Sequence, residues 1–365
     1  MKVIYISIEQ RIKSLRKAIR ENNLDAAVIF SAQNRRYFAN FPGSSGALII
    51  TETNSILLTD FRYIDDAKSS STSHYEVIQH PGGQLEQSVG EQMKKMNLHK
   101  IGIENSLPVG SLKKLEKQLP KAHFLLIDSY IMQIRMIKDE SEINHIREGI
   151  RICDLAFEHI TGFLKPGMSE KEIGLELEYV MKKHGAEGIK ENHVIASGER
   201  SSLPHGQATD RIVEVGDFVK MDFGAKVNGY YTDFTRTVVI GEPTEKQKEI
   251  YSIVSKALEE SLKQVGPGKK CNELDEVGRS IIRNAGYGEH FGHSLGHSLG
   301  LNIHESPAMR STDNTILKPG MVITVEPGIY LSGWGGVRIE DLVVIRENGI
   351  ENLTKATKEL QIINN

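Results

Sequence analysis

Cysteine, aromatic residues and long hydrophobic runs are scarce in this sequence, and each shortage excludes a class of protein. The 365 residues include two cysteines, one tryptophan and 6% aromatic residues. Cys153 and Cys271 lie far apart and offer neither a disulfide framework nor a Cys-x-x-Cys metal site, which favours a reducing, cytoplasmic compartment. No run approaches the roughly 18 apolar residues of a membrane span. The apolar stretch at the N-terminus is interrupted by charged residues and is too short for a secretory signal.

A large excess of charge of either sign is also missing. The net charge is −3, so the composition gives no reason to expect nucleic acid or an anionic membrane as a partner. With 39% apolar and 25% charged residues, the chain can bury one large core or two medium ones. Its length predicts about two domains.

Two patterns of secondary structure divide the chain. Residues 1–136 alternate helical and strand-like segments, and the apolar runs 47–50 and 56–58 flank a predicted hairpin turn, so we expect a small α/β domain. In residues 137–365 the helices are grouped apart from the strands, which favours α+β over a doubly wound sheet. Capping boxes predict helices that begin after Asp139, Ser169 and Thr244.

The first candidate site is a hairpin that carries two aspartates. Asp222 and Asp233 flank an Asn-Gly turn at 228–229, which places them near each other on adjacent strands. Two buried carboxylates repel each other and are costly to ionise unless a cation joins them. The alternative is that they cap turns or pair with Lys226 or Arg236.

A second hairpin carries two glutamates. Glu326 and Glu340 each interrupt an apolar strand, on either side of a glycine-rich turn at 333–336. A single glutamate in a strand is usually exposed at an edge or paired, here with Arg338. Two acid-bearing hairpins with a similar layout instead suggest that four carboxylates converge.

The segment between the hairpins contains four histidines within fifteen residues: His290, His293, His297 and His304. A lone histidine is more often an ordinary core or surface residue, but this clustering favours a site. Four carboxylates and an imidazole suit Mn(II), Co(II) or Zn(II) in a dinuclear centre. Two such metals, about 3.5–4 Å apart, can activate a water molecule and polarise a carbonyl, which is hydrolytic chemistry.

Competing motifs can be excluded. The sequence GHSLG at 292–296 and again at 296–300 matches a nucleophile elbow, which requires an acid and then a histidine later in the chain. No histidine follows His304, so a serine hydrolase is excluded. Ala308 stands where a zincin needs its second histidine, and residues 266–270 lack the spacing of a P-loop.

These motifs resemble the pita-bread metallopeptidases, which include Xaa-Pro aminopeptidase, Xaa-Pro dipeptidase (prolidase) and methionine aminopeptidase. The segments NRRYFANFPGSSGALII and LLTDFRYIDDA are similar to the creatinase-type N-terminal domain of the proline-specific branch. The resemblance implies a creatinase-type α/β domain at 1–136, followed by an α+β pita-bread catalytic domain at 137–365.

The resemblance also implies a metal-ligand set. Asp222 would bind one metal, His297 and Glu326 would bind the other, and Asp233 and Glu340 would bridge them. Glu326 would also accept a proton from the water molecule. The family usually has Gly-His-Gly around the histidine ligand. Here a serine follows the histidine, and because serine is small we expect the ligand geometry to be kept.

Three further histidines match family positions at the substrate site. His205, in Leu-Pro-His-Gly, and His293 and His304 would contact the scissile carbonyl and the proline pocket and stabilise the tetrahedral intermediate. Arg338 resembles an arginine that orients a ligand.

The implied function is an Xaa-Pro aminopeptidase that removes the residue before a proline at the second position of a peptide. The alternative is a prolidase restricted to dipeptides. The N-terminal domain favours both over methionine aminopeptidase. Two divalent ions, Mn(II) first and Co(II) or Zn(II) otherwise, and a homodimer are expected by resemblance.

Two other readings compete with a peptidase. A creatinase-like amidinohydrolase shares the fold but lacks the carboxylate set. A non-catalytic peptide-binding relative would show neither bound metal nor turnover.

Overall fold

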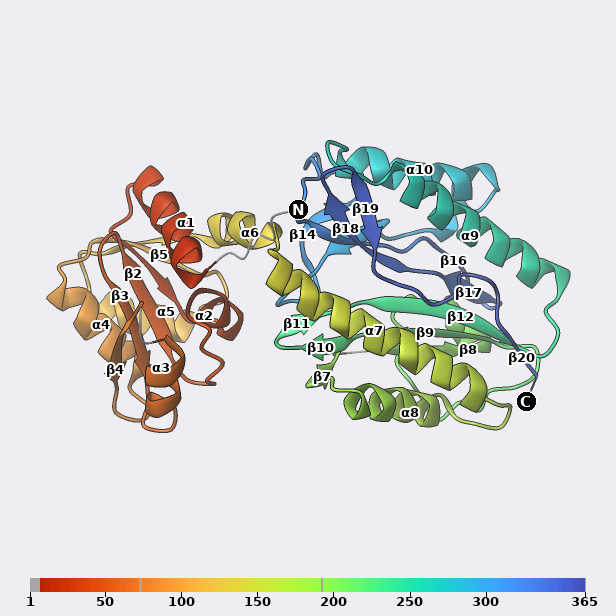
Figure 1. Ribbon diagram of the computed structural model, residues 1–365, viewed down its shortest axis with the longest axis horizontal. Coiled ribbons are helices and arrows are strands. Elements are labelled where there is room, and N and C mark those ends of the chain that lie inside the picture. Colours follow the sequence, from red (N-terminus) through yellow and green to blue (C-terminus); the bar gives the residue numbers. More distant parts are fainter. Residues whose placement is uncertain (1–6, 72–73, 192, 365) are drawn as a thin grey trace. The chain divides into compact units, whose positions relative to one another are not determined.

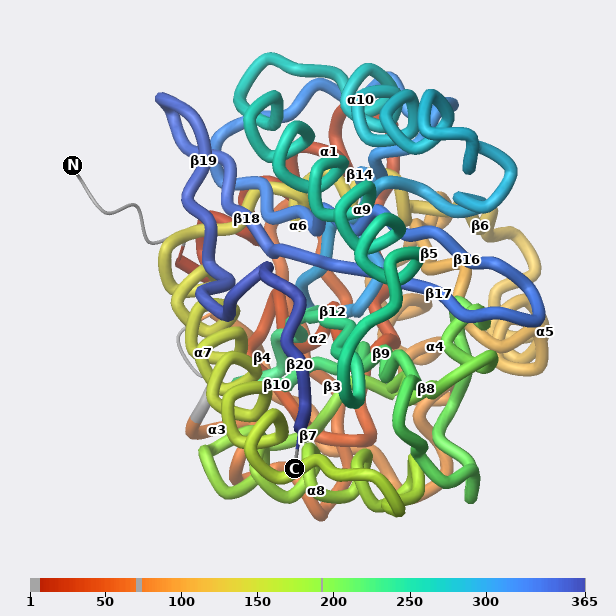
Figure 2. The backbone as a smooth tube through the Cα atoms, turned by 90° about the vertical axis from the view of Figure 1, so that its right-hand side faces the viewer, coloured from red at the N-terminus to blue at the C-terminus, as the bar shows by residue number. Residues whose placement is uncertain are grey.

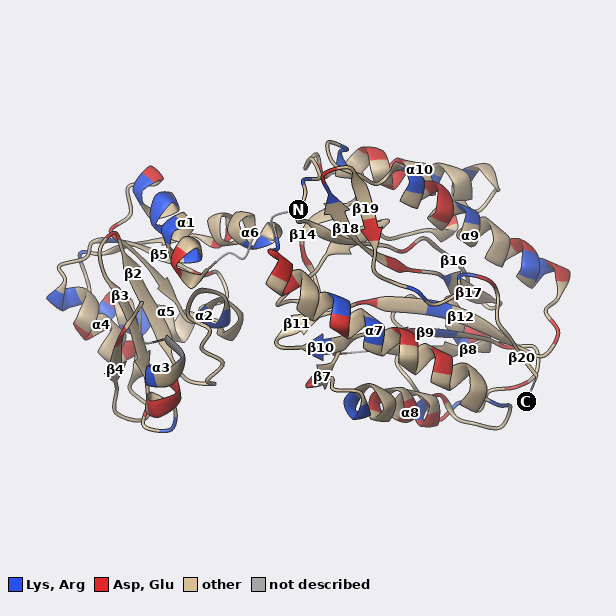
Figure 3. Ribbon diagram, in the orientation of Figure 1, with Lys and Arg blue, Asp and Glu red and all other residues tan. Residues whose placement is uncertain are grey.

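The computed structural model describes residues 7–71, 74–191 and 193–364, and the chain divides into two compact units, Met1–Arg135 and Met136–Asn365 (Figure 1). Within the described ranges, no helix combines the length and the apolar character needed to cross a membrane. Residues of both charge signs are mixed along the long helices of the second unit, so neither sign dominates them (Figure 3).

The first unit is built on a six-stranded mixed sheet. Its strands are, in spatial order, β4 (Glu76–Gln79), β3 (Ser55–Thr59), β2 (Ala47–Thr51), β1 (Ala26–Ile29), β5 (Lys100–Ile103) and β6 (His123–Leu126). The helices along this part of the chain are α1 (Ile8–Glu21), α2 (Ala32–Ala39), α3 (Ile64–Ser71), α4 (Leu85–Lys95), α5 (Val109–Gln118) and α6 (Asp128–Met136). The predicted hairpin is confirmed, because β2 and β3 pair with Ile50 opposite Ser55.

Two pairs of helices enclose the strands of the second unit (Figures 1 and 2). The pairs are α7 (Glu140–Phe163) with α8 (Glu170–Lys183), and α9 (Glu245–Gln264) with α10 (Cys271–Asn284). The predicted capping boxes before α7, α8 and α9 are all present, so those helix starts are confirmed. Each box satisfies amide groups that the first helical turn would otherwise leave unpaired.

Among the described residues of the second unit, the strands form four small sheets. These are β11 (Tyr230–Tyr231), β10 (Ala225–Val227) and β7 (Gly188–Ile189); β20 (Ile362–Ile363), β12 (Phe234–Ile240), β9 (Phe218–Phe223) and β8 (Val194–Ser197); β14 (Glu305–Met309), β13 (Gly296–Ser298), β15 (Val322–Val325), β18 (Asp341–Arg346) and β19 (Gly349–Asn352); and β16 (Gly328–Leu331) with β17 (Gly335–Arg338). Short 3₁₀ helices η1 (Gly198–Ser202) and η2 (Gly288–His290) complete the unit.

The aspartate-bearing hairpin forms as predicted, with one interruption. β9 and β12 are antiparallel, and Asp222 pairs with Thr235. The tip is the Asn-Gly turn at 228–229, where both residues have positive φ angles of 47° and 81°. The strand is interrupted at Gly224, between β9 and β10, and a Cβ there would lie 2.0 Å from the carbonyl oxygen of Thr232, so only glycine fits at this position. The two arms of the hairpin therefore lie very close to each other at Gly224 and Thr232, next to Asp222 and Asp233.

The glutamates lie where strands break. Glu326 follows β15 directly, and Glu340 lies between β17 and β18. β15 pairs with β18, and Val325 lies opposite Asp341, so the two glutamates are next to this paired end. The predicted glycine-rich hairpin is confirmed as β16 and β17. A residue at a strand break can turn its side chain toward a shared point without losing a ladder hydrogen bond.

Candidate metal centre and comparisons with known proteins

Three of the predicted acidic residues meet at one buried point. Asp222, Asp233 and Glu340 each offer a carboxylate oxygen, and these atoms all lie within 4.8 Å of one another. Thr235 Oγ1 donates to Glu340 Oε2 at 2.7 Å, whereas Glu340 Oε1 is buried without a hydrogen-bond partner among the described residues. A buried carboxylate oxygen without a donor is costly, so this atom marks a place for a cation.

His297 and Glu326 extend the cluster on one side. The His297 Nε2 atom lies 3.3 Å from Glu326 Oε1 and 3.6 Å from Asp233 Oδ2. Its Nδ1 lies 3.0 Å from the carbonyl oxygen of Ser298, which can only accept, so the ring proton sits on Nδ1. Burial lowers the pKa of His297, so the ring is neutral and the Nε2 lone pair faces carboxylate oxygens. That arrangement fits a cation between them and is typical of a metal-binding histidine.

The cluster carries more negative charge than the cations around it balance. Burial alone would raise the pKa of Asp222, but Lys190 and Arg338 hold it below its usual range. Burial raises the pKa of Asp233 to about 6 and that of Glu326 to about 7.

Burial, with Asp233 and Glu326 nearby, also raises the pKa of Glu340 well above its ordinary value. These neighbouring carboxyl groups resist ionisation, and a divalent cation bound among them would lower the free-energy cost of ionising them. The residues present therefore fit a divalent metal centre.

Arg338 links the cluster to the predicted substrate histidines. Its guanidinium donates to Asp222 Oδ2, and Nη1 donates to the Tyr330 hydroxyl at 2.7 Å and to the carbonyl oxygen of Pro204 at 3.1 Å. Pro204 directly precedes His205, which is itself exposed. The arginine thus holds both an acidic residue of the cluster and the backbone beside a predicted substrate-binding residue.

His293 is fixed through the same tyrosine. The Tyr330 hydroxyl accepts from Arg338, so its own proton is free for His293 Nε2, 2.8 Å away. His293 Nδ1 lies 2.8 Å from the carbonyl oxygen of Ser294 and must be the protonated nitrogen. Burial lowers the pKa of His293 to about 3, in agreement with a neutral ring. Both ring nitrogens are engaged, which leaves the ring face for contact with an apolar group.

The structure brings the remaining predicted residue, His304, beside the cluster: its ring centroid lies 4.4 Å from that of His297.

The serine that departs from the family pattern also has a partner, because Lys138 Nζ donates to Ser298 Oγ at 3.1 Å and to Glu305 Oε2 at 3.3 Å. Gly296, on the other side of His297, packs so closely that a Cβ would lie 1.9 Å from the Thr324 carbonyl oxygen.

Two lysines, the partly buried Lys190 and the fully buried Lys220, were not predicted from the sequence. Lys190 contacts the aspartates directly, whereas Lys220 Nζ donates to the carbonyl oxygens of Ser201 and Leu203 at 2.8 and 2.6 Å and so holds the segment that leads to His205. A signal for Lys220 exists, since it lies two residues before Asp222 and shares its face of β9. Lys190 lies in a polar stretch that gives no such signal.

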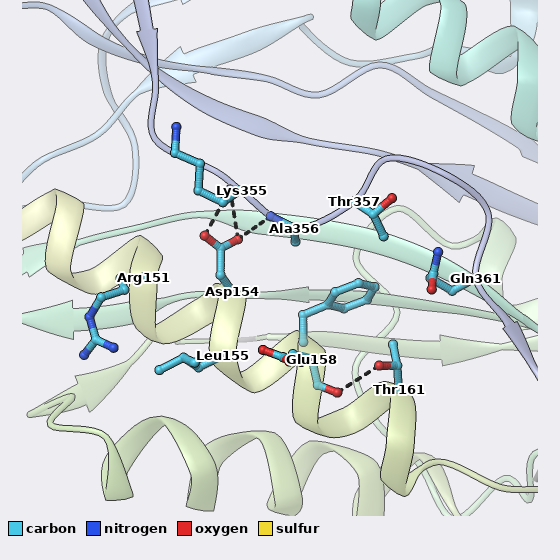
Figure 4. Close-up of a pocket in the computed structure, with 10 residues that line it drawn as sticks. Arg151, Asp154, Leu155, Glu158, Thr161, Lys355, Ala356, Thr357 and Gln361 are labelled. Carbon is cyan, nitrogen blue, oxygen red and sulfur yellow. Dashed lines mark hydrogen bonds between the residues drawn. The ribbon is translucent and has the colours of Figure 1, made fainter.

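A separate cavity of about 450 Å³ contains none of the predicted site residues (Figure 4). It lies between α7 and the C-terminal segment 355–361. There the Asp154 carboxylate accepts hydrogen bonds from the backbone amides of Lys355 and Ala356, the latter at 2.8 Å. These contacts fasten the C-terminal segment to the helix, which is a structural role.

Comparisons with known proteins agree with this fold. A model of metallopeptidase family M24 matches residues 144–347, and one of the creatinase/prolidase N-terminal domain matches residues 11–137. The chain is 39% identical over 355 residues to a protein named Xaa-Pro dipeptidase from Pyrococcus horikoshii, covering 97% of this chain and 99% of the relative.

Solved structures give the same picture. An Xaa-Pro dipeptidase from Bacillus anthracis has a TM-score of 0.94 at 41% identity, covering 98% of this chain and all of that one. An X-Pro aminopeptidase from Thermotoga maritima has a TM-score of 0.88 at 39% identity, covering 95% of this chain and all of that one. Fold and matches together define a hydrolase of the metallopeptidase class. The chain belongs to metallopeptidase family M24, and the predicted fold class is confirmed.

The raised pKa of Glu326 predicts a pH-dependent stability of the EDTA-treated protein. The fold holds this proton up to about pH 7, whereas the unfolded chain releases it near 4.5. The stability from this group is therefore complete below 4.5 and is lost as the pH rises to 7. Relative to Glu326→Gln, the wild type should lose up to about 3 kcal/mol across this range.

Urea unfolding in EDTA at pH 5 and pH 8, followed through the fluorescence of Trp334, measures this difference. Trp334 is the one tryptophan of the sequence and lies in the second unit, so its signal reports the unit that contains Glu326. A stability difference between the two proteins that stays constant with pH would contradict the prediction.

Proposed function

We propose that the chain is an Xaa-Pro dipeptidase that hydrolyses the X-Pro bond of dipeptides with two divalent metal ions. The observation that carries the proposal is the full-length similarity to proteins named Xaa-Pro dipeptidase, at 39% and 41% identity. The sequence alone favoured an Xaa-Pro aminopeptidase, and the named relatives favour the alternative. The aminopeptidase stays as the second candidate because of the Thermotoga maritima neighbour.

Five residues would hold the metals, with Mn(II) as the first candidate. Asp222 would serve one metal position, His297 and Glu326 would serve the other, and Asp233 and Glu340 would be shared between the two. Supporting this set are the convergence of three carboxylates and the lone pair of His297. When bound, two divalent ions activate a water molecule and polarise the scissile carbonyl.

The side chains supply proton transfer and positioning. Glu326 would accept at a carboxylate oxygen the proton that the attacking water molecule gives up, and would pass it to the proline nitrogen as that nitrogen leaves. Thr324 Oγ1 orients this carboxylate through a hydrogen bond of 3.0 Å to Oε1. A carboxylate held beside the attacking water is the kind of group that accepts and then returns a proton in hydrolysis.

The substrate contacts fall to the three histidines. His205 and His304 are exposed, so each can present a ring N–H to the oxygen of the scissile carbonyl and to the substrate carboxylate. His293, whose two ring nitrogens are already hydrogen-bonded, offers its ring face to the apolar proline ring. We therefore assign His293 to the proline pocket and not to proton transfer.

Peptide hydrolysis tests the proposal. After removal of metals with EDTA and reconstitution with Mn(II), we expect Ala-Pro to be split, Ala-Pro-Ala to react at least about tenfold more slowly, and Ala-Ala-Ala to be left intact, with products identified by mass. The reason is that a dipeptidase pocket recognises the carboxylate directly after proline. Protein kept in EDTA is the control and should be inactive.

The other outcomes are distinct. Release of alanine from Ala-Pro-Ala at the rate of Ala-Pro hydrolysis would establish the aminopeptidase. Removal of the first residue of Ala-Ala-Ala would refute the proline specificity but would still support a metallopeptidase. No cleavage with Mn(II), Co(II) or Zn(II) would favour the non-catalytic peptide-binding reading.

The proposal includes a cytoplasmic homodimer. Cys153 and Cys271 are both free and buried, which agrees with a reducing compartment. The dimer rests on the resemblance to the proline-specific branch, and analytical ultracentrifugation would test it.

A further inference from the structure

The side chain of Lys190 lies between the two aspartates of the proposed metal centre. Its Nζ atom is 2.5 Å from Asp222 Oδ1 and 2.6 Å from Asp233 Oδ1. The lysine side chain is 11% exposed, and the two aspartate side chains are 7% and 3% exposed. These values separate the contact from a surface ion pair, in which solvent screens the charges.

The lysine takes the oxygens that a metal would need. Arg338 already donates to Asp222 Oδ2, so the lysine engages the remaining oxygen of that residue. On Asp233, Oδ1 also accepts from the amide of Phe234 at 3.1 Å. An ammonium ion and a divalent ion on the same pair of oxygens would lie within about 4 Å of each other and repel strongly in a buried site. Only one of them can occupy this position at a time.

The lysine can leave without a change in the fold. Its main-chain N–H donates to the carbonyl oxygen of Gly224 at 2.7 Å, which fixes the backbone on the β9–β10 connection. The ammonium is therefore carried by four flexible methylene groups on a fixed backbone. Rotation of these bonds is enough to withdraw the charge from between the carboxylates.

We infer that Lys190 is the built-in counter-ion of the Asp222–Asp233 pair and that a metal ion must displace it to bind there. The inference rests on the proposed dinuclear site. It makes the two metal positions unequal. The position formed with His297 and Glu326 binds first, and the position at Asp222 binds more weakly, because its metal competes with a covalently attached cation.

Calorimetric titration of the EDTA-treated full-length protein with Mn(II) tests the inference. We expect two unequal sites in the wild type and, in Lys190→Met, a weaker site tightened at least about tenfold, which corresponds to about 1.4 kcal/mol. In EDTA the midpoint of thermal unfolding of Lys190→Met should be lower than that of the wild type, because the aspartates lose their counter-ion. Excess Mn(II) should remove that deficit.

The matched control is Lys226→Met. Lys226 lies nearby on β10, where its ammonium contacts the ring of Tyr231 at 4.9 Å from the centroid. Both Mn(II) affinities and the unfolding midpoint in EDTA should stay at wild-type values. If Lys190→Met does not fold, Lys190→Gln keeps an amide donor for the carboxylates without the charge, and the same tenfold tightening is expected.

Two results would overturn the inference, and they differ. Unchanged Mn(II) affinities in a folded Lys190 variant would show that the lysine does not compete, and would leave the metal site standing. No binding of Mn(II), Co(II) or Zn(II) by either wild type or variant would remove the metal site itself, and the inference with it.

Discussion

Glu340→Gln should lower kcat/KM for Ala-Pro by at least about a thousandfold, equivalent to about 4 kcal/mol of transition-state stabilisation. Glu340 is 1% exposed and has one oxygen bonded to Thr235 and one without a partner among the described residues. A glutamine keeps the shape but cannot bridge two cations. The same variant should leave the metal-free protein as stable as the wild type, or more so, because glutamine cannot ionise beside the other buried carboxyl groups.

The pair of readouts separates a metal ligand from a structural residue. Substitution of a residue that the fold needs would lower both activity and stability. Substitution of the proposed ligand should lower activity and Mn(II) content without lowering stability. Asp233→Asn should lower activity and Mn(II) content to a similar degree, but because it also removes a partner of Lys190 its metal-free stability is not used as a readout. Glu351→Gln is the control, since Glu351 lies on the neighbouring strand β19 and pairs with Arg147 and Arg346. Near-normal activity in Glu340→Gln or Asp233→Asn would refute the ligand assignment.

The parts of this structure that could be predicted from the sequence are those fixed by local chemistry. The Asn-Gly turn needs two positive φ angles, which these two residues tolerate, so the aspartate hairpin could be placed from sequence alone. A capping box, which spans four residues, likewise predicts where a helix begins. The placement of four acids on two hairpins likewise predicts a single cluster of carboxylates.

The contacts that could not be predicted join distant segments. Lys190 and Asp222 are 32 residues apart, and Lys138 and Ser298 are 160 apart. No periodicity links such pairs, because their approach depends on how whole sheets pack. The close approach of Gly224 to the carbonyl oxygen of Thr232, which leaves no room for a side chain, is likewise set by packing. Local signals thus identified the acids, and tertiary packing decided which cations accompany them.

The guanidinium of Arg236, like that of Arg338, joins the two acid-bearing hairpins, and its removal should cause a large loss of stability. Arg236 on β12 is 1% exposed. Its donors reach the carbonyl oxygens of Thr235, Glu340, Ala356 and Thr357 and the carboxylate of Asp341. Because Glu340 and Asp341 belong to the second hairpin and Arg236 to the first, the side chain holds together the strands that carry the proposed ligands.

Arg236→Met should therefore lower the free energy of unfolding by about 3–5 kcal/mol, since the fully buried Asp341 Oδ1 and several carbonyl oxygens lose their donor, although Asp341 Oδ2 keeps Asn352 and Lys358. Trp334 fluorescence during urea unfolding reports this loss from the second unit. Lys248→Met is the control, because Lys248 pairs with Glu245, whose side chain is 91% exposed, and should change stability by less than about 0.5 kcal/mol.

A loss of less than about 1 kcal/mol in Arg236→Met would mean that main-chain pairing alone fixes the two hairpins. If the larger loss is found, we also expect Arg236→Met to bind Mn(II) more weakly. Among the described residues, Arg236 forms no hydrogen bond with the side chain of a proposed metal ligand. It touches Glu340 through its carbonyl oxygen only. The geometry of the metal centre would then depend on a buried cation that organises the backbone beneath it, just as its charge balance depends on Lys190 and Arg338 beside it.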